Sequence, residues 1–479
     1  MGDSFGLSCY ATLPHRYGAA TPGEYRFASS CCISTAWYRK GPFWLLDRAR
    51  ERNSAPVNML KGLYKIAITL ACCEALRALL LGSYFSPVPA FADDPGAQLE
   101  QEASQDQGTL LPSLGRDWLA EQGLSLELIA INDNFANVRG GVRRGVGSMG
   151  NLNVIFTIDT AKAGWWENGS FTIYGIWLYG QRPSEWVGDF QFTSSIDGPV
   201  PELEPYEAYY EHTFMDGRLK WLAGIHDLTL DFATLDFAFN YINSSFTTPS
   251  TITQLPYSFY PNTSWGTRGI YRVTEELYAM LGFYDGQPAT ADNLSTSNLG
   301  ITAEDGIYSI AEFGYKGSLS GYYTKLLFGA WHCSGKFTDV AGDLKHSNFG
   351  TYLLGERELW HENELGDQGL GAFFQVGQSQ QDRNLNPWYF GFGGRYKGLV
   401  PSREDDVLSV GLAMAYFGDT AQTAIPGLEQ SERTFEINYR APVTSWLTLS
   451  PDVQFVIDPY GNPDLENDLI LYVRSEVTL

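Results

Sequence analysis

A short run of alternating residues carries the side chains best suited to bind a polar ligand. In the segment Tyr206–Glu211, the residues Glu207, Tyr209 and Glu211 occupy every second position. Side chains two residues apart on a strand point to the same face, so two carboxylates and a phenol would share one surface. Carboxylates accept hydrogen bonds from hydroxyl groups and attract cations, and an aromatic ring offers an apolar face to a sugar. The pattern therefore predicts a polar binding surface.

Three arginines and one further glutamate extend this candidate surface. Glu127 lies in the first strand-like segment of the chain, and Arg268 alternates with Tyr271 so that the two would face opposite sides. Arg143 and Arg144 follow a pair of glycines in a turn, from which they could reach a constriction or simply face solvent. Facing arginine and glutamate groups would set up a transverse field that orients water and dipolar ligands.

The elements that must position these residues are strands with one apolar and one polar face. Residues 435–440, 447–457 and 471–478 alternate apolar and polar side chains almost without exception. Such alternation is typical of a half-buried soluble sheet, and also of a membrane barrel with lipid outside and water inside. The polar residues of Tyr206–Glu211 favour the barrel's inner face, because a charge facing lipid near the midplane costs about 2–4 kcal/mol.

The organisation of the chain favours the membrane barrel. About 16 strand-like segments follow one another from Leu124 to the last residue, and short turns alternate with long loops at 182–204, 227–264 and 286–304. An even number of antiparallel strands closes without an edge, and about 16 strands leave a water-filled lumen. We therefore predict an all-β fold, a transmembrane antiparallel barrel of the outer-membrane type.

Composition agrees with this fold and excludes other classes. The 479 residues include 14% aromatic residues and 50 glycines, which suit strands, interfacial girdles and turns. No stretch of about 18 apolar residues is present, so a membrane-spanning helix is not predicted. The formal net charge of −23 makes nucleic acid an improbable partner.

The N-terminal part is expected to lie outside the mature domain. Residues 59–92 have a basic start, an apolar core and a closing Ala-Phe-Ala pattern, as in a signal peptide. Residues 1–58 are then an extension from a start codon placed too far upstream, or an organelle presequence. Residues 93–118 form an acidic periplasmic tail with a short helix, and residues 119–479 form the barrel. Of the six cysteines only Cys333 would remain, so no intramolecular disulfide is expected.

Several motifs, in order along the chain, resemble the carbohydrate-selective porins of the OprB type. The resemblance runs from about Asp117 to Leu479 and implies a sugar-conducting channel, not an enzyme, in the outer membrane of a Gram-negative bacterium. It implies small sugars as permeants, outer-membrane lipid as surroundings, no cofactor, and either a homotrimer or a monomer. The motifs that carry it include 140–145, 175–177, 206–211, 216–219, 311–315, 367–371, 382–384, 396–399 and 405–408.

The resemblance gives one expectation about a single residue, and strand alternation gives another. Arg268 matches an arginine expected in this family. Within the strand-like segment Phe171–Tyr179, Ile176 and Leu178 are expected to face lipid, which turns Trp177 into the lumen as a sugar platform. The alternative for Trp177 is a place in the aromatic girdle at the membrane boundary.

Three alternatives to a sugar channel remain open. A cation-preferring porin of the same fold would follow if the acidic surplus lined the lumen. The resemblance also implies an amino-acid porin as an alternative, because relatives of the family include at least one that looks like one. A secreted β-rich glycosidase would need two carboxylates at a defined separation, and no pair stands out. The six histidines lack the spacing of metal ligands, so no metal site is predicted.

Overall fold

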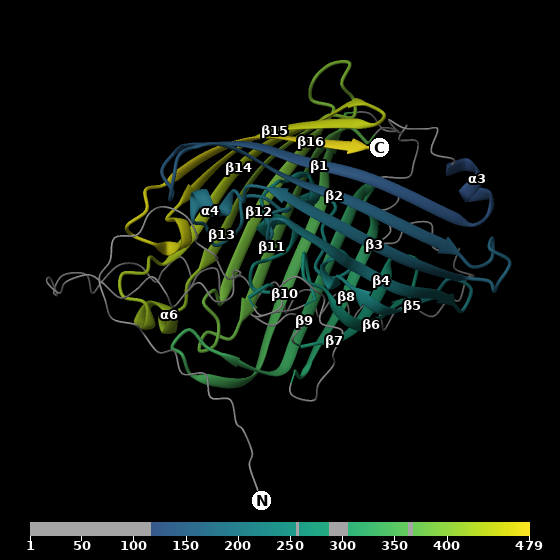
Figure 1. Ribbon diagram of the computed structural model, residues 1–479, viewed down its shortest axis with the longest axis horizontal. Coiled ribbons are helices and arrows are strands. Elements are labelled where there is room, and N and C mark those ends of the chain that lie inside the picture. Colours follow the sequence, from purple (N-terminus) through teal and green to yellow (C-terminus); the bar gives the residue numbers. More distant parts are fainter. Residues whose placement is uncertain (1–115, 255–257, 287–304, 363–366) are drawn as a thin grey trace, which may run out of the picture.

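The chain forms one closed barrel of sixteen antiparallel strands in the computed structural model, which describes residues 116–254, 258–286, 305–362 and 367–479 (Figure 1). Each strand pairs with its sequence neighbours, and β1 pairs with β16 to close the ring. The strands are β1 (Leu124–Arg139), β2 (Gly145–Asp159), β3 (Gly169–Gly180), β4 (Glu202–Phe214), β5 (Leu219–His226), β6 (Ser264–Arg272), β7 (Leu277–Asp285), β8 (Ile307–Leu319), β9 (Tyr322–Thr338), β10 (Leu344–His361), β11 (Gly369–Ser379), β12 (Trp388–Lys397), β13 (Val407–Tyr416), β14 (Ser431–Thr444), β15 (Leu447–Ile457) and β16 (Asp468–Thr478).

Helices in the described ranges are short and lie in the connections. They are α3 (Arg116–Glu121), α4 (Ser184–Val187), α5 (Ser244–Thr247), α6 (Asp419–Ala424), η2 (Leu228–Leu230), η3 (Ala238–Asn240) and η4 (Pro459–Gly461). None of these helices is long and apolar enough to cross a bilayer.

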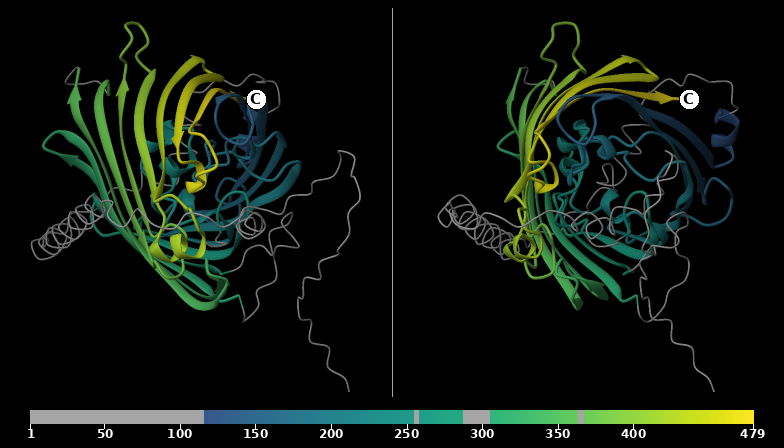
Figure 2. Two further views of the ribbon diagram at one scale, coloured as in Figure 1. Left: turned by 90° about the vertical axis from the view of Figure 1, so that its left-hand side faces the viewer. Right: turned by 60° about the vertical axis from the view of Figure 1, so that its left-hand side comes forward.

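The two ends of the barrel differ. Connections such as 215–218, 320–321 and 445–446 are tight turns at the end that holds α3 and the C-terminus, which we call the turn end. The connection 181–201 and the described residues 227–254 and 258–263 emerge at the opposite end, the loop end. They lie inside the ring of strands, where Figure 2 shows them in teal. Outer-membrane barrels place short turns in the periplasm and long loops outside the cell.

The outer face is apolar and carries aromatic residues near both ends. Along the strands, exposed side chains such as Ile173, Leu281 and Val473 alternate with buried polar ones, as a lipid-facing wall requires. Aromatic belts are typical of the two membrane–water boundaries. The outward rings near the turn end are Trp165, Trp166, Phe171, Tyr210, Trp221, Tyr322, Trp360 and Tyr396, and those near the loop end are Trp177, Tyr179, Trp265, Trp388 and Tyr416.

The predicted fold class is confirmed, including the number of strands. The loops expected at 182–204 and 227–264 correspond to connections of nearly the same bounds, except that β4 begins at Glu202. Of the loop expected at 286–304, residues 287–304 lie outside the described residues. The signal peptide, the upstream extension and most of the acidic tail lie outside the described residues, and only α3 represents the short helix expected before residue 119.

Candidate functional site in the barrel lumen

The connection between β5 and β6 folds back into the barrel, and we call its described residues, 227–254 and 258–263, the inner loop. Its large apolar side chains pack against the inner faces of the strands rather than facing water. Because a buried loop must satisfy its own backbone groups, its docking has to be specific. The fully buried members are Leu228, Phe232, Leu235, Phe237, Tyr241 and Phe246.

Glycines in the wall make room for the rings of the inner loop. A Cβ atom on Gly371 would lie 2.5 Å from Cε2 of Phe237, and one on Gly411 would lie 2.7 Å from Cε1 of Tyr241. Real Cβ atoms do not approach other carbons that closely, so any larger residue would push the loop away. The wall is therefore shaped to receive these two rings.

Four inward-facing glutamates of the wall accept hydrogen bonds from the backbone of the inner loop. All four are buried, with exposures between 0 and 4%. Such a hydrogen bond contributes about 0.5–1.5 kcal/mol, and leaving a buried N–H without a partner costs about 1–3 kcal/mol, so the set fixes the loop along its length. The N–H groups donate from Asp227 to Glu207 at 2.9 Å, from Ala233 to Glu312 at 2.8 Å, from Phe237 to Glu356 at 2.8 Å and from Ile242 to Glu436 at 2.6 Å.

A second connection, residues 181–201 between β3 and β4, also lies in the lumen, and we call it the second loop. The N–H of Ser195 donates to the carbonyl oxygen of Ile242 at 2.7 Å, which joins the second loop to the inner loop. Glu432 of β14 accepts from the N–H of Gln191 at 2.8 Å. Within this loop, burial raises the pKa of Asp189 to about 6, and the neighbouring carboxyl group of Asp197 adds to the rise. Together the two joined loops occupy part of the lumen and narrow the passage.

Lysines neutralise the acid that the inner loop carries at Asp236. The Nζ of Lys325 lies 2.9 Å from Oδ1 of Asp236, and the Nζ of Lys316 lies 3.6 Å from Oδ2. Burial alone would raise the pKa of Asp236, but the two lysines and the hydroxyl of Tyr323 outweigh it, so the pKa falls below its usual range. Asp236 is thus a paired anion rather than a free one.

The structure brings four of the predicted residues together on β4 and β6. Nη2 of Arg268 lies 2.7 Å from Oε2 of Glu211, and the rings of Tyr209 and His226 are 5.4 Å apart. Glu207 lies on the same inward face, where it is buried under the inner loop. The predicted inward orientation of this strand face agrees with the structure, whereas a contact with a permeant stays a prediction.

The remaining polar candidates lie near the two ends of the barrel. Glu127 is half-buried near the start of β1, at the turn end, on the same strand face as the inward Asp133. Arg143 lies with its guanidinium 4.0 Å from the ring centre of Trp186, and Arg144 forms an exposed ion pair of 3.3 Å with Glu466. Both arginines therefore lie at the loop-end mouth, away from the cluster around Arg268.

The expected orientation of Trp177 was wrong. Trp177 is 46% exposed on the outer face, beside Tyr179, whereas Ile176 and Leu178 are buried in the lumen. The reason is that the two loops cover this part of the wall, so apolar side chains face inward there. Ile176 and Leu178 share a cluster with Tyr206. A Cβ atom on Gly198 of the second loop would lie 2.9 Å from Leu178. Trp177 belongs to the aromatic belt at the loop end.

Sequence reasoning missed the charged pair that spans the closing seam. Nε and Nη2 of Arg474 donate to the two carboxylate oxygens of Asp133 at 2.7 and 2.8 Å, and Ser194 of the second loop donates to the same carboxylate. In the sequence, Arg474 stands on the polar face of its strand, whereas Asp133 lies between Asn132 and Asn134, where alternation assigns no face. Only the closure of β1 on β16 brings them together.

The chain that forms this sixteen-strand barrel, with its infolded loop, matches a known protein family in sequence. The family model described as "Carbohydrate-selective porin, OprB family" covers residues 143–479. This chain belongs to the OprB family. It is accordingly a channel of the outer membrane of Gram-negative bacteria and not an enzyme.

Individual relatives of the family are distant in sequence. Porin B of Pseudomonas aeruginosa is 21% identical over 253 residues, 45% of this chain and 55% of that protein, so the alignment spans about half of that relative. The high-pH structure of Pseudomonas putida OprB has a TM-score of 0.70 at 18% identity and covers 76% of this chain and 96% of its own. Its low-pH structure gives 0.54 at 15% identity, with 78% and 100% covered. These structures share the fold of this chain.

Proposed function

We propose that this porin conducts small, neutral sugars by passive or facilitated diffusion along the inner loop. The observation that carries the proposal is that five acidic groups of the lumen already have partners. Glu207, Glu312, Glu356 and Glu436 accept from loop N–H groups, and Asp133 is paired with Arg474. Carboxylates with such partners are poorly placed to concentrate mobile cations, which favours an uncharged permeant over a cation.

The inner loop also offers groups that suit a sugar. Its side chains that are not fully buried include the ring of Phe239, the amide of Asn240 and the hydroxyls of Ser244 and Thr247. We infer that these groups face the remaining passage, because the opposite face of the loop packs on the wall. The amide of Asn240 and the hydroxyl of Thr247 also donate to the carbonyl oxygens of Phe237 and Ser244. Hydroxyls and amides exchange hydrogen bonds with sugar hydroxyls, and an aromatic ring covers the apolar face of a pyranose.

A planar-bilayer experiment tests the proposal. Glucose or maltose added to the wild-type channel should reduce ion current reversibly, and Phe239→Ala should weaken that block about tenfold. Trp177→Ala is the matched control, since it removes an aromatic ring from the outer wall, and block should not change. Strong cation selectivity in a salt gradient together with no block by any sugar would instead support the cation-preferring channel.

A further inference from the structure

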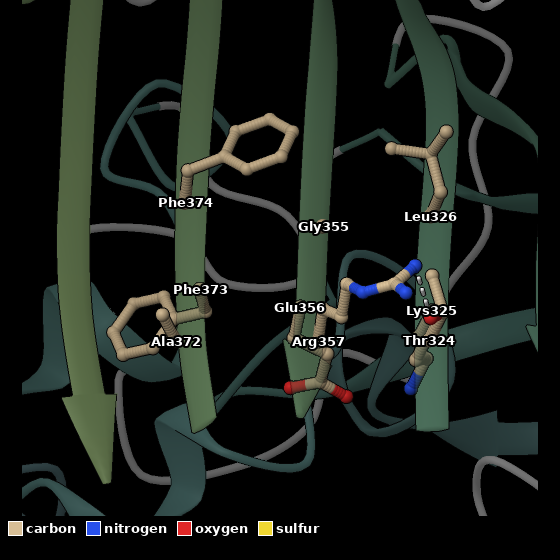
Figure 3. Close-up of a pocket in the computed structure, with 9 residues that line it drawn as sticks. All are labelled: Thr324, Lys325, Leu326, Gly355, Glu356, Arg357, Ala372, Phe373 and Phe374. Atoms are coloured by element: carbon tan, nitrogen blue, oxygen red, sulfur yellow. Dashed lines mark hydrogen bonds between the residues drawn. The ribbon is translucent and has the colours of Figure 1, made fainter. Parts of the chain in front are cut away.

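The outer wall carries a groove that neither strand pairing nor conduction requires. Leu326 on β9 and Phe374 on β11 flank Gly355 on β10, and Figure 3 shows their side chains reaching toward one another across the bare glycine. A Cβ on Gly355 would lie 2.7 Å from Cε1 of Phe374 and 3.1 Å from Cδ1 of Leu326. The hollow encloses about 310 Å³ and its accessible lining is almost wholly apolar.

A cation lies at the end of this groove that is nearer the turn end. Arg357 is two residues beyond Gly355, so its side chain leaves β10 on the same outward face. Its guanidinium donates to Oγ1 of Thr324 at 3.3 Å and to the carbonyl oxygen of Leu319 at 3.0 Å. Among the described residues, no carboxylate lies within 4.0 Å of it. An arginine on the outer wall is tolerated near the membrane boundary, where its charge costs about 0–1 kcal/mol.

The aromatic belt gives the height of this cation in the membrane. Trp360 follows Arg357 by three residues on β10, is 47% exposed and lies 6.1 Å from the ring of Tyr396. The ring of Tyr322 lies 5.8 Å from the guanidinium carbon. Tryptophan and tyrosine collect at the level of lipid headgroups. Arg357 is thus at headgroup level, and the groove at Gly355 is deeper, at the level of acyl chains.

We propose that Arg357 and the groove at Gly355 form a binding site for an anionic glycerophospholipid of the periplasmic leaflet. The phosphate would receive charge-assisted hydrogen bonds from the guanidinium, and one acyl chain would lie between Leu326 and Phe374. The turn end faces the periplasm in outer-membrane barrels, which assigns the leaflet. Charge complementarity selects this occupant over a second copy of the chain. A guanidinium without a carboxylate partner among the described residues, at the end of an apolar groove, matches a molecule with an anionic head and a hydrocarbon tail.

Native mass spectrometry of the detergent-solubilised protein with added dioleoyl-phosphatidylglycerol tests the site. We expect the wild type to retain the lipid about tenfold more tightly than Arg357→Gln, which removes the charge. Gly355→Leu, which fills the groove, should weaken retention to a similar extent. The matched control is Arg433→Gln: Arg433 also faces outward but lies at the loop end and is paired with Asp458. Its loss should leave retention unchanged.

Further measurements in the same experiment decide between the possible occupants of the groove. Glycerol phosphate, which has the headgroup chemistry without the chains, should not displace the lipid at equal concentration; displacement would show simple anion binding and overturn the site. Equal retention by Arg357→Gln and wild type would also overturn it, as would equal loss in Arg433→Gln. A change of oligomeric mass in Gly355→Leu with lipid retention intact would assign the groove to a second copy. Heat-modifiable migration on gels checks whether each variant folds. If Gly355→Leu does not fold, Gly355→Ala is used in its place, because its methyl group meets only the ends of side chains.

Discussion

Arg474 and Asp133 form a two-pronged hydrogen-bonded ion pair across the seam between the last and the first strand. The two donor nitrogens lie 2.7 and 2.8 Å from the two carboxylate oxygens, and both side chains are almost fully buried, at 7% and 0% exposure. The carboxylate also accepts from Ser194 of the second loop at 2.7 Å. The carboxylate of Asp133 thus holds β1 to β16 and also holds the second loop in its place in the lumen.

Breaking this pair should destabilise the barrel strongly. Asp133→Asn leaves a buried guanidinium without its counter-ion, which costs about 3–5 kcal/mol. We expect urea unfolding in detergent micelles, followed by tryptophan fluorescence, to report a loss of that order. The double variant Asp133→Asn with Arg474→Gln should recover part of it, since neither charge is then stranded. A loss below about 1 kcal/mol in the single variant would show that water replaces the partner.

Loosening one anchor of the inner loop should make the channel noisy. Glu356 accepts from the N–H groups of Asp236 and Phe237 at 3.0 and 2.8 Å. Glu356→Gln replaces one accepting oxygen by an amide that cannot accept, so one buried N–H loses its partner at about 1–3 kcal/mol. We expect greater open-channel current noise in single-channel recordings. Glu476→Gln, on the wall but paired with Arg440, is the control and should conduct as quietly as wild type.

The fold was predictable because its main signal is local. Alternation with period two is written into each strand separately, so residues such as Phe435 and Glu436 reveal their faces without knowledge of the rest of the chain. The order and number of strands then follow from the antiparallel rule and the turns between them. The same argument placed Glu207, Tyr209 and Glu211 on one inward face.

The lumen was less predictable because its contacts are distant in sequence. The inner loop reads as an ordinary loop, yet its N–H at Ile242 finds its partner at Glu436, 194 residues away. Alternation also fails where a loop covers the wall: Ile176 and Leu178 are apolar because they face the infolded loops, not because they face lipid. That is why Trp177 was assigned to the wrong side.

Filling the wall beneath the inner loop should cost stability. Gly411 faces the rings of Tyr241 and Phe246, and its Cβ would lie 2.7 and 2.8 Å from them. Gly411→Val should destabilise the barrel by about 1–3 kcal/mol in urea unfolding, as overpacking does. Gly269→Val adds the same side chain on the outer face, where the nearest atom is 3.9 Å away. That control should be neutral or slightly stabilising, because valine favours strands; equal losses in both would argue against a docked loop.

The second loop should make the protein more stable in mild acid than at neutral pH. Burial raises the pKa of Asp189 to about 6 from an ordinary value of 3.8, with Asp197 adding to the rise. The folded state therefore binds the proton more tightly than the unfolded state, so this contribution is present below about pH 4 and is lost as pH rises through about 6. A shift of this size corresponds to about 3 kcal/mol.

Asp189→Asn tests this dependence, because an amide keeps the shape of the protonated acid without titrating. The free energy of unfolding should fall between pH 4 and pH 7 in the wild type, and the fall should shrink by about 3 kcal/mol in Asp189→Asn. Asp464→Asn, at an exposed position in the connection between β15 and β16, is the control and should retain the wild-type slope. If Asp189→Asn kept the full slope as well, the titrating group would have to be another buried acid, and the loop carboxylate would be ionised throughout this range.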